Sequence, residues 1–216
     1  MQVIPVNEKL MASFFVVKKK GAIKIDIKQK KKEEYGMQLA YKGFDPDLSC
    51  RGLKFKQTEW NEEPEANCVK NGFHCAENPL DCLTYYRNMD RSVYYVVAVD
   101  GDIDEDGYDT KIAGTRMKLV KQLSKLEFVA HALKYMQAHP YRRDSNNVEQ
   151  EKGEVTSNHF VIVRGKDPVA KGKSGDILAF CKEEANSKKI VDMDMWEVGK
   201  DNLLPDVWYD MNGQRR

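Results

Sequence analysis

Apolar and polar residues alternate near the N-terminus in a way typical of a β-hairpin. Phe14–Val17 is an apolar run, and the isoleucines of segment 23–27 alternate with charged residues. Gly21 stands between them, where a tight turn requires conformational freedom. We expect residues 1–36 to form a hairpin with one apolar and one basic face. Its lysines either contact phosphates or an acidic partner, or protect a solvated edge strand against aggregation.

Two segments carry the signals of a helix start. Asn78 can cap a helix that opens at Pro79, and Ser124 with Glu127 forms a capping box. The second helix should end before Pro140. Its apolar residues recur on one face, beside which we expect a surface histidine, His131. The face comprises Leu126, Val129, Ala130, Leu133 and Met136.

The remaining apolar runs predict β-strands. Val93–Val99 is nearly continuous in apolar and aromatic residues, which is typical of a central strand. Residues 140–157 are polar and predict a linker. Short strands are then expected in segments 159–163, 175–181 and 190–196. We therefore divide the chain into a hairpin (1–36), a core domain (37–139), the linker (140–157) and a C-terminal β module (158–216).

Composition narrows the class of protein only slightly. The 216 residues carry a net charge of +1 and are 41% hydrophobic, which favours neither a disordered chain nor a general nucleic-acid binder. The five cysteines form no Cys-x-x-Cys pair, so we expect free thiols in a reducing compartment. No signal peptide or membrane span is evident, and we expect a cytoplasmic protein of a bacterial host cell with no membrane partner.

An acidic segment has the spacing of a calcium-binding loop. Asp102, Asp104, Asp106 and Gly107 match the alternating carboxylates and the glycine of such a loop. However, Ala113 occupies the position of the bidentate glutamate. A solvated acidic turn is the alternative to a calcium site.

Several motifs resemble an uncharacterised family of phage and prophage proteins. They are Tyr41–Asp45, Cys50–Leu53, Asn71–Asp81 and Gly101–Asp104, followed by a C-terminal pattern from Gly175 to Tyr209. This resemblance implies an origin in a mobile element and does not indicate an activity.

The layout also resembles the first half of an ADP-ribosyltransferase of the diphtheria-toxin and poly-ADP-ribose-polymerase type. Leu39–Gly43 is similar to the strand that holds nicotinamide, and Gly72–Glu77 is similar to the strand-to-helix motif that precedes a stacking tyrosine. The resemblance implies NAD as cofactor. The residues that would bind it are Lys42, Gly43, Gly72, Phe73, His74, Tyr85 and Tyr86. Alternatively, these glycines lie in turns and these tyrosines in the core.

The catalytic glutamate of that family has no counterpart here. The matching position is Arg116 on one alignment and His159 on the other, and Glu154 would match only with a register shifted by several residues. An arginine would repel the positive charge that develops as nicotinamide leaves. We therefore expect no catalytic residues of the standard kind.

These observations lead to one fold and one leading function. We expect an α+β fold: a central, mostly antiparallel sheet with two helices and an ADP-ribosyltransferase-like core, plus the N-terminal hairpin and a C-terminal β extension. The leading function is a phage- or prophage-encoded accessory protein without a required cofactor. It would bind a host protein or complex, or nucleic acid through the basic hairpin, as an inhibitor of host defence of the anti-CRISPR kind. The alternatives are an active NAD-dependent transferase and a calcium-dependent binding module.

Overall fold

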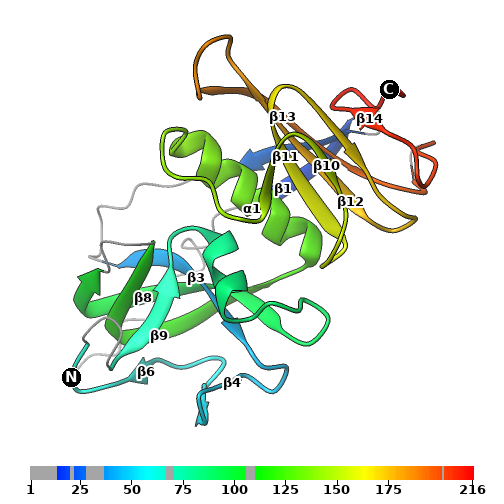
Figure 1. The fold of residues 1–216 in the computed structure, drawn as a ribbon. Helices are drawn as coiled ribbons and strands as arrows, with labels where there is room; N and C mark the ends of the chain where they lie inside the picture. Colours follow the sequence, from blue (N-terminus) through cyan, green and yellow to red (C-terminus); the bar gives the residue numbers. More distant parts are fainter. Residues whose placement is uncertain (1–13, 20–21, 28–36, 67–70, 106–109, 201) are drawn as a thin grey trace.

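The structure is a computed structural model of the 216-residue chain. It describes residues 14–19, 22–27, 37–66, 71–105, 110–200 and 202–216. Figure 1 shows two β-rich parts with one helix between them. In the described segments, the N-terminal strands β1 (Phe14–Lys19) and β2 (Ala22–Ile27) pair antiparallel as a hairpin.

The first β-rich part is a small closed barrel. Four antiparallel strands form its ring, in the order β3, β7, β9 and β8, and β8 pairs with both β3 and β9. Their bounds are Gln38–Phe44 (β3), Phe73–Ala76 (β7), Val93–Glu105 (β8) and Lys111–Leu123 (β9). Two short additions flank the ring: β6 (Asn61–Glu62) pairs with β9, and β4 (Ser49–Cys50) pairs with β5 (Leu53–Lys54).

Glycines and irregular pairing allow the two long strands to curl until the ring closes. The β8–β9 pairing shifts register between Asp100 and Ile103. Gly101 there has a φ of +84°, and a Cβ at this position would lie 2.0 Å from the Thr115 hydroxyl oxygen. A Cβ on Gly114 would lie 2.2 Å from a Val99 methyl carbon. Bulges and side-chain-free positions of this kind are how sheets bend into barrels.

The closed barrel shows that the expected fold class is wrong. The protein is mostly β, and its core is a four-stranded barrel with two small helices alongside, not an α+β core of the ADP-ribosyltransferase type. The sequence interpretation missed that β9 runs unbroken for 13 residues. A strand of this length reaches β8 on one side and β7 on the other, so an open sheet is replaced by a ring.

The second β-rich part is a C-terminal five-stranded sheet. Its order is β10, β11, β12 and β13, with β14 paired to β11. The bounds are Val148–Glu154 (β10), Phe160–Lys171 (β11), Ile177–Glu183 (β12), Ile190–Glu197 (β13) and Tyr209–Asp210 (β14). The expected linker therefore contains a strand. β10 pairs with β11 through Val148 and Ile162, so Val148 is a buried apolar residue within an otherwise polar stretch.

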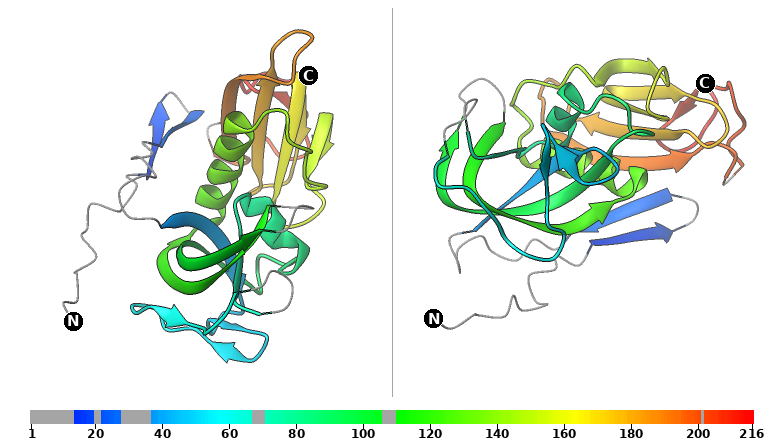
Figure 2. Two further views of the ribbon diagram at one scale, coloured as in Figure 1. Left: turned by 90° about the vertical axis from the view of Figure 1, so that its left-hand side faces the viewer. Right: turned by 90° about the horizontal axis from the view of Figure 1, so that it is seen from below.

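The two helices begin where the capping signals predict. The 3₁₀ helix η2 (Pro79–Thr84) has Asn78 as its cap, and α1 (Lys125–Ala138) has the full Ser124–Glu127 capping box. α1 lies between the barrel and the C-terminal sheet, as the views in Figure 2 confirm. Within the described residues, no helix is long and apolar enough to span a bilayer.

Three groups of buried side chains hold these layers together. One fills the barrel and includes Phe44, Phe73 and Met117. Another lies within the C-terminal part, around Phe180 and Trp196. The largest joins both parts through α1, because Leu80 of η2, Phe128 of α1 and Ile162 of β11 belong to one cluster. The core domain and the C-terminal module thus share a core.

Candidate functional site

The barrel brings together segments that are far apart in the sequence. β3 pairs with β7 through Tyr41 and Ala76, and β7 pairs with β9 through His74 and Ala113. The Lys42 ammonium donates a hydrogen bond of 2.6 Å to the His74 carbonyl oxygen. This neighbourhood contains the motifs around residues 41–45, 50–53 and 71–81. We call it the His74 site, and it comprises Lys42, Gly43, Arg51, His74, Tyr85, Tyr86 and Lys111.

Gly43 gives Tyr86 room to lie against the backbone of β3. A Cβ on Gly43 would lie only 2.6 Å from a ring carbon of Tyr86. The Tyr86 hydroxyl forms a hydrogen bond with Cys50, and the Tyr94 hydroxyl donates to the Tyr86 carbonyl oxygen. Burial, together with Cys50, raises the pKa of Tyr86. Gly43 is thus required by packing, and the ring of Tyr86 forms one wall of the site.

Positive charges gather around the half-buried imidazole of His74. Burial lowers the pKa of His74, and the charges of Lys42, Arg51 and Lys111 lower it further. A hydrogen bond with the Gly72 backbone acts in the opposite direction. His74 is therefore neutral at pH 7, in a place where an anion would be stabilised.

Lys42 supplies its charge from inside the barrel. It is only 6% exposed, and its ammonium lies 5.5 Å from the ring centre of Phe44 and 5.4 Å from that of Phe55. Among the described residues it forms no ion pair with a carboxylate. Two aromatic faces and one carbonyl therefore stabilise this cation.

Arg51 and Tyr85 present exposed groups at the rim of the site. Arg51 and Gly52 form the two-residue turn between β4 and β5, with φ values of 51° and 82°. Positive φ at both positions suits Asn-Gly, and a non-glycine residue other than Asn or Asp is strained there. Tyr85 follows η2, is 55% exposed, and has the Lys111 ammonium 5.1 Å from its ring centre.

The other residues of the predicted nicotinamide site have structural roles. Gly72 has a φ of +84°, and a Cβ there would lie 2.9 Å from the backbone of Ala66. Phe73 is 3% exposed in the barrel core, edge-on to Phe55. Gly72 thus fits the structural alternative of a glycine in a turn, and Phe73 is a core residue.

Neither residue that matches the position of the transferase family's catalytic glutamate, Arg116 or His159, lies in the His74 site. Arg116 lies on β9 opposite β6 and pairs with Asp100 at 3.1 Å and Glu62 at 3.3 Å. His159 immediately precedes β11 and lies between two carboxylates, Asp176 at 3.1 Å and Asp90 at 3.5 Å. Both positions are used to hold the fold together.

The start of the acidic segment is a strand where a loop was expected. Asp102 and Asp104 belong to β8, and Asp104 pairs with Ala113 of β9. Their side chains, and the whole of Asp106, lie outside the described residues. Among the residues that the structure describes, no three metal-ligating side chains gather as a metal site.

Sequence reasoning missed two members of the site, Arg51 and Lys111. The Arg51-Gly52 pair stands between short apolar segments, where glycine after a polar residue is a turn signal. Lys111 precedes the alternating stretch of β9, whose Met117 and Leu119 point into the barrel. That period-two pattern is the signal that could have revealed the strand.

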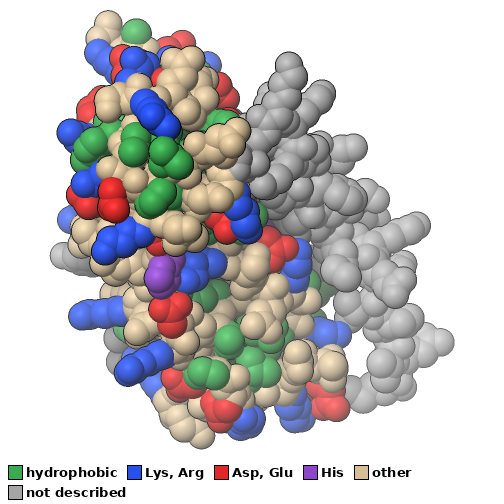
Figure 3. Space-filling view, turned by 90° about the vertical axis from the view of Figure 1, so that its right-hand side faces the viewer, with side chains coloured by type: hydrophobic (Ala, Val, Ile, Leu, Met, Phe, Trp, Pro, Cys, Tyr) green, Lys and Arg blue, Asp and Glu red, His purple; other side chains and the backbone are tan. Residues whose placement is uncertain are grey.

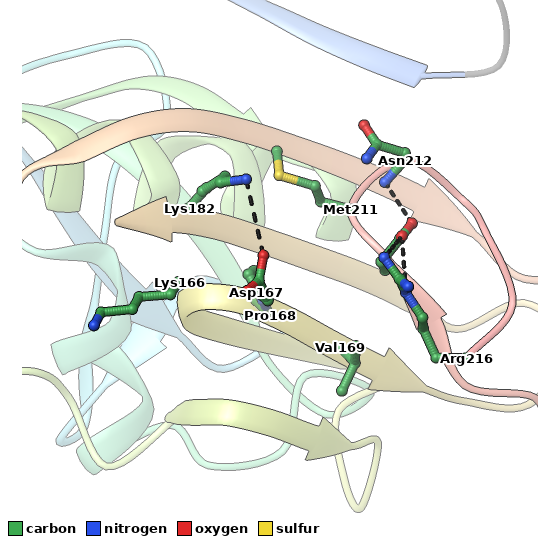
Figure 4. A pocket seen from close by; sticks show the side chains of 9 residues that line it. Lys166, Asp167, Pro168, Val169, Lys182, Met211, Asn212 and Arg216 are labelled. Atoms are coloured by element: carbon green, nitrogen blue, oxygen red, sulfur yellow. Dashed lines mark hydrogen bonds and ion pairs between the residues drawn. The ribbon is translucent and has the colours of Figure 1, made fainter. Parts of the chain in front are cut away.

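A separate hollow lies on the C-terminal sheet. It encloses about 410 Å³ between the part of β11 that follows Gly165 and the segment after Asp210 (Figure 4). An acidic side chain stabilises each of its two edges. Glu151 accepts hydrogen bonds from the backbone N–H groups of Lys166 and Asp167, and Asp210 forms an ion pair with Arg216 at 2.7 Å. None of the residues predicted from the sequence lines this hollow.

Charge is evenly mixed over the face shown in Figure 3. Positive and negative side chains alternate there without a continuous field of one sign, and apolar side chains form small groups. With a net charge of +1, long-range attraction of a partner by the whole protein is not expected. On this face, recognition would rest on local arrangements of side chains.

Comparison with protein families gives a match over part of the chain. Residues 38–131 match the model of a domain of unknown function, DUF7666. The matched region covers the barrel, η2 and the first half of α1, and so contains the whole His74 site. No curated protein and no solved structure matches the chain.

Proposed function

We propose that the protein is an accessory protein of a phage or prophage that binds a host macromolecule through the His74 site and carries out no chemical step there. The convergence of three sequence motifs on this site is the observation that carries the proposal. Packing alone does not require Arg51 and Tyr85 to be exposed beside one half-buried histidine.

The composition of the rim supports a binding role. Tyr85 is 55% exposed, and Leu53, on the same hairpin as Arg51, is 43% exposed. Tyrosine and arginine are enriched among the residues that dominate binding energy at interfaces. Both stand on elements fixed by hydrogen bonds, so little ordering accompanies binding.

The backbone of Arg51 gives further support. A left-handed conformation costs an L-residue roughly 1–2 kcal/mol relative to glycine. Such strain clusters at functional sites, where a side chain is retained for what it contacts. An arginine at this turn is explained if its guanidinium binds a partner.

The alternative functions have less support. Transfer of ADP-ribose would require an ADP-ribosyltransferase core, and the structure has a barrel instead. Neither position that matches the catalytic glutamate of that family, Arg116 or His159, carries a carboxylate. A calcium-dependent module would have to form at Asp102, Asp104 and Asp106. Unchanged thermal unfolding at millimolar calcium would remove that possibility.

Capture of a partner by matched variants tests the proposal. The wild-type protein and its Tyr85→Ala and Tyr141→Ala variants are immobilised and exposed to lysate of a bacterial host. Tyr141 is a suitable control because it is 73% exposed and lies outside the site. We expect the same host component on the wild type and Tyr141→Ala, and at least tenfold less on Tyr85→Ala. Equal capture by all three would contradict the proposal.

A defence system is the host target that we propose. Its test is the plating efficiency of a phage on cells with an active CRISPR system. Expression of the wild-type protein should raise plating, and Tyr85→Ala should not. No change with the wild type would reject this target.

A further inference from the structure

The His74 site combines local positive charge with an exposed aromatic ring. Lys42 lies behind His74, and Arg51 and Lys111 lie around it. Arg51, like Lys42, makes no ion pair with a carboxylate of the described residues. Two acids of adjoining segments accept hydrogen bonds from hydroxyl groups: Asp45 accepts from Ser49 at 3.3 Å, and Asp81 accepts from Thr110 at 2.6 Å.

Tyr85 adds a flat surface to this charge. Lys111 lies 5.1 Å from its ring centre, and the side chain remains 55% exposed. Positive charge beside an exposed aromatic ring is the combination with which proteins bind the backbone of a single strand and stack its bases. Arginine also binds phosphate in a planar, two-point geometry.

We infer that the His74 site binds the phosphodiester backbone of a single-stranded nucleic acid, with the neighbouring base stacked on Tyr85. This inference deepens the proposed function and rests on the same site. A nucleotide supplies the anion and the flat ring in a single unit, whereas an acidic peptide supplies only the charge. Arg51, His74 and Lys111 would contact the phosphate, and Lys42 would act from behind through its charge.

Proton linkage gives the inference a specific readout. A bound phosphodiester would offset the cations around His74, so the pKa of His74 should rise on binding. The complex would then take up a proton, and affinity should increase as the pH falls from 8 to 6. The diester keeps its charge over this range, so the change would originate in the protein.

The experiment measures binding of an eight-nucleotide thymidine strand by fluorescence anisotropy and the titration of His74 by NMR. Sulfate and an eight-residue aspartate peptide serve as comparison ligands. The variants are Tyr85→Ala, Arg51→Asn, and Arg143→Asn as an exposed control outside the site. Asparagine tolerates positive φ, so Arg51→Asn should unfold at a higher temperature than the wild type.

We expect the strand to raise the pKa of His74 and to bind at least tenfold more tightly than the peptide. Arg51→Asn and Tyr85→Ala should each weaken binding about tenfold, and Arg143→Asn less than twofold. Arg51→Asn should also reduce the salt dependence of log K by about 0.7, the value for one lost phosphate contact with a single strand.

Several results would overturn the inference. They are strand binding that leaves His74 unchanged, equal binding of the peptide, binding of sulfate only, and no binding of the strand at low salt. The capture experiment separates this inference from the proposed function. A partner that is lost from Tyr85→Ala but survives nuclease treatment would support docking and reject nucleic acid. Strand binding without any host partner would do the reverse.

Discussion

Gly43 shows how a single hydrogen atom can decide whether two elements pack. Tyr86 lies directly over it, and a Cβ would lie 2.6 Å from the ring. Gly43→Ala should therefore lower the free energy of unfolding by about 1–3 kcal/mol, the usual cost of overpacking. Urea denaturation measures this change.

The matched test is a double-mutant cycle with Tyr86→Ala. Removing the ring should make Gly43→Ala nearly neutral, because the clash is gone. Equal costs in both backgrounds would show that the ring is not what excludes the methyl group.

Arg164 is the most highly connected buried charge of the described residues. It is 1% exposed and pairs with Glu183 at 2.5 Å and Asp144 at 2.7 Å. It also donates to the carbonyl oxygens of Pro140 and Lys188. Its guanidinium therefore ties the segment after α1 to the C-terminal sheet.

Arg164→Met should be strongly destabilising. It leaves two largely buried carboxylates without their cation, for which a loss of about 3–5 kcal/mol is expected in denaturant unfolding. Adding Asp144→Asn and Glu183→Gln should recover part of this loss. A single variant within about 1 kcal/mol of the wild type would be inconsistent with this account.

Among the elements, α1 is the one whose start depends on a few named contacts. Ser124 accepts from the backbone of Glu127, and the Glu127 carboxylate accepts from the backbone of Ser124 at 2.9 Å. Ser124→Ala should cost about 1 kcal/mol, typical of a lost helix cap. Thermal unfolding followed by circular dichroism measures it, with Ser187→Ala in an exposed turn as the control.

The sequence predicted the elements better than their connection. Local signals marked the caps of η2 and α1, the strand at Val93 and the N-terminal hairpin, and these elements are present. Closure of the barrel could not be predicted in this way, because it depends on pairing between β7 and β9, which are distant in sequence. β10 was missed because one buried residue, Val148, stands among polar neighbours.

The candidate site was predicted in part for the same reason. Lys42, Gly43, His74, Tyr85 and Tyr86 were selected by resemblance to another fold, and the structure does bring them together. It gives Gly43 a packing role, however. The charges that define the site, Arg51 and Lys111, come from a turn and a strand whose proximity to His74 is set only by the tertiary structure.

At the scale of the whole molecule, His131 joins the barrel to α1. The sequence suggested a surface position, but the residue is 3% exposed, and its ring lies 2.8 Å from the Tyr41 hydroxyl. Burial lowers its pKa to about 4, with Lys121 lowering it further and Glu127 opposing this. The residue is thus neutral in the folded protein at pH values where the unfolded chain is protonated.

This difference predicts a loss of stability in acid. As the pH falls from about 6.5 to about 4, the unfolded state takes up a proton that the folded state does not. The free energy of unfolding should fall by roughly 3 kcal/mol over this window. Urea denaturation at four pH values tests it. His131→Gln should flatten the profile.

At Arg51, which has a left-handed backbone conformation, selection for stability and selection for ligand binding favour different residues. A library selected for heat resistance alone should soon replace this codon with one for glycine or asparagine. A library selected for retention of the ligand should keep arginine and accumulate its compensating changes elsewhere. The residue recovered at position 51 would therefore report whether durability or recognition had been rewarded.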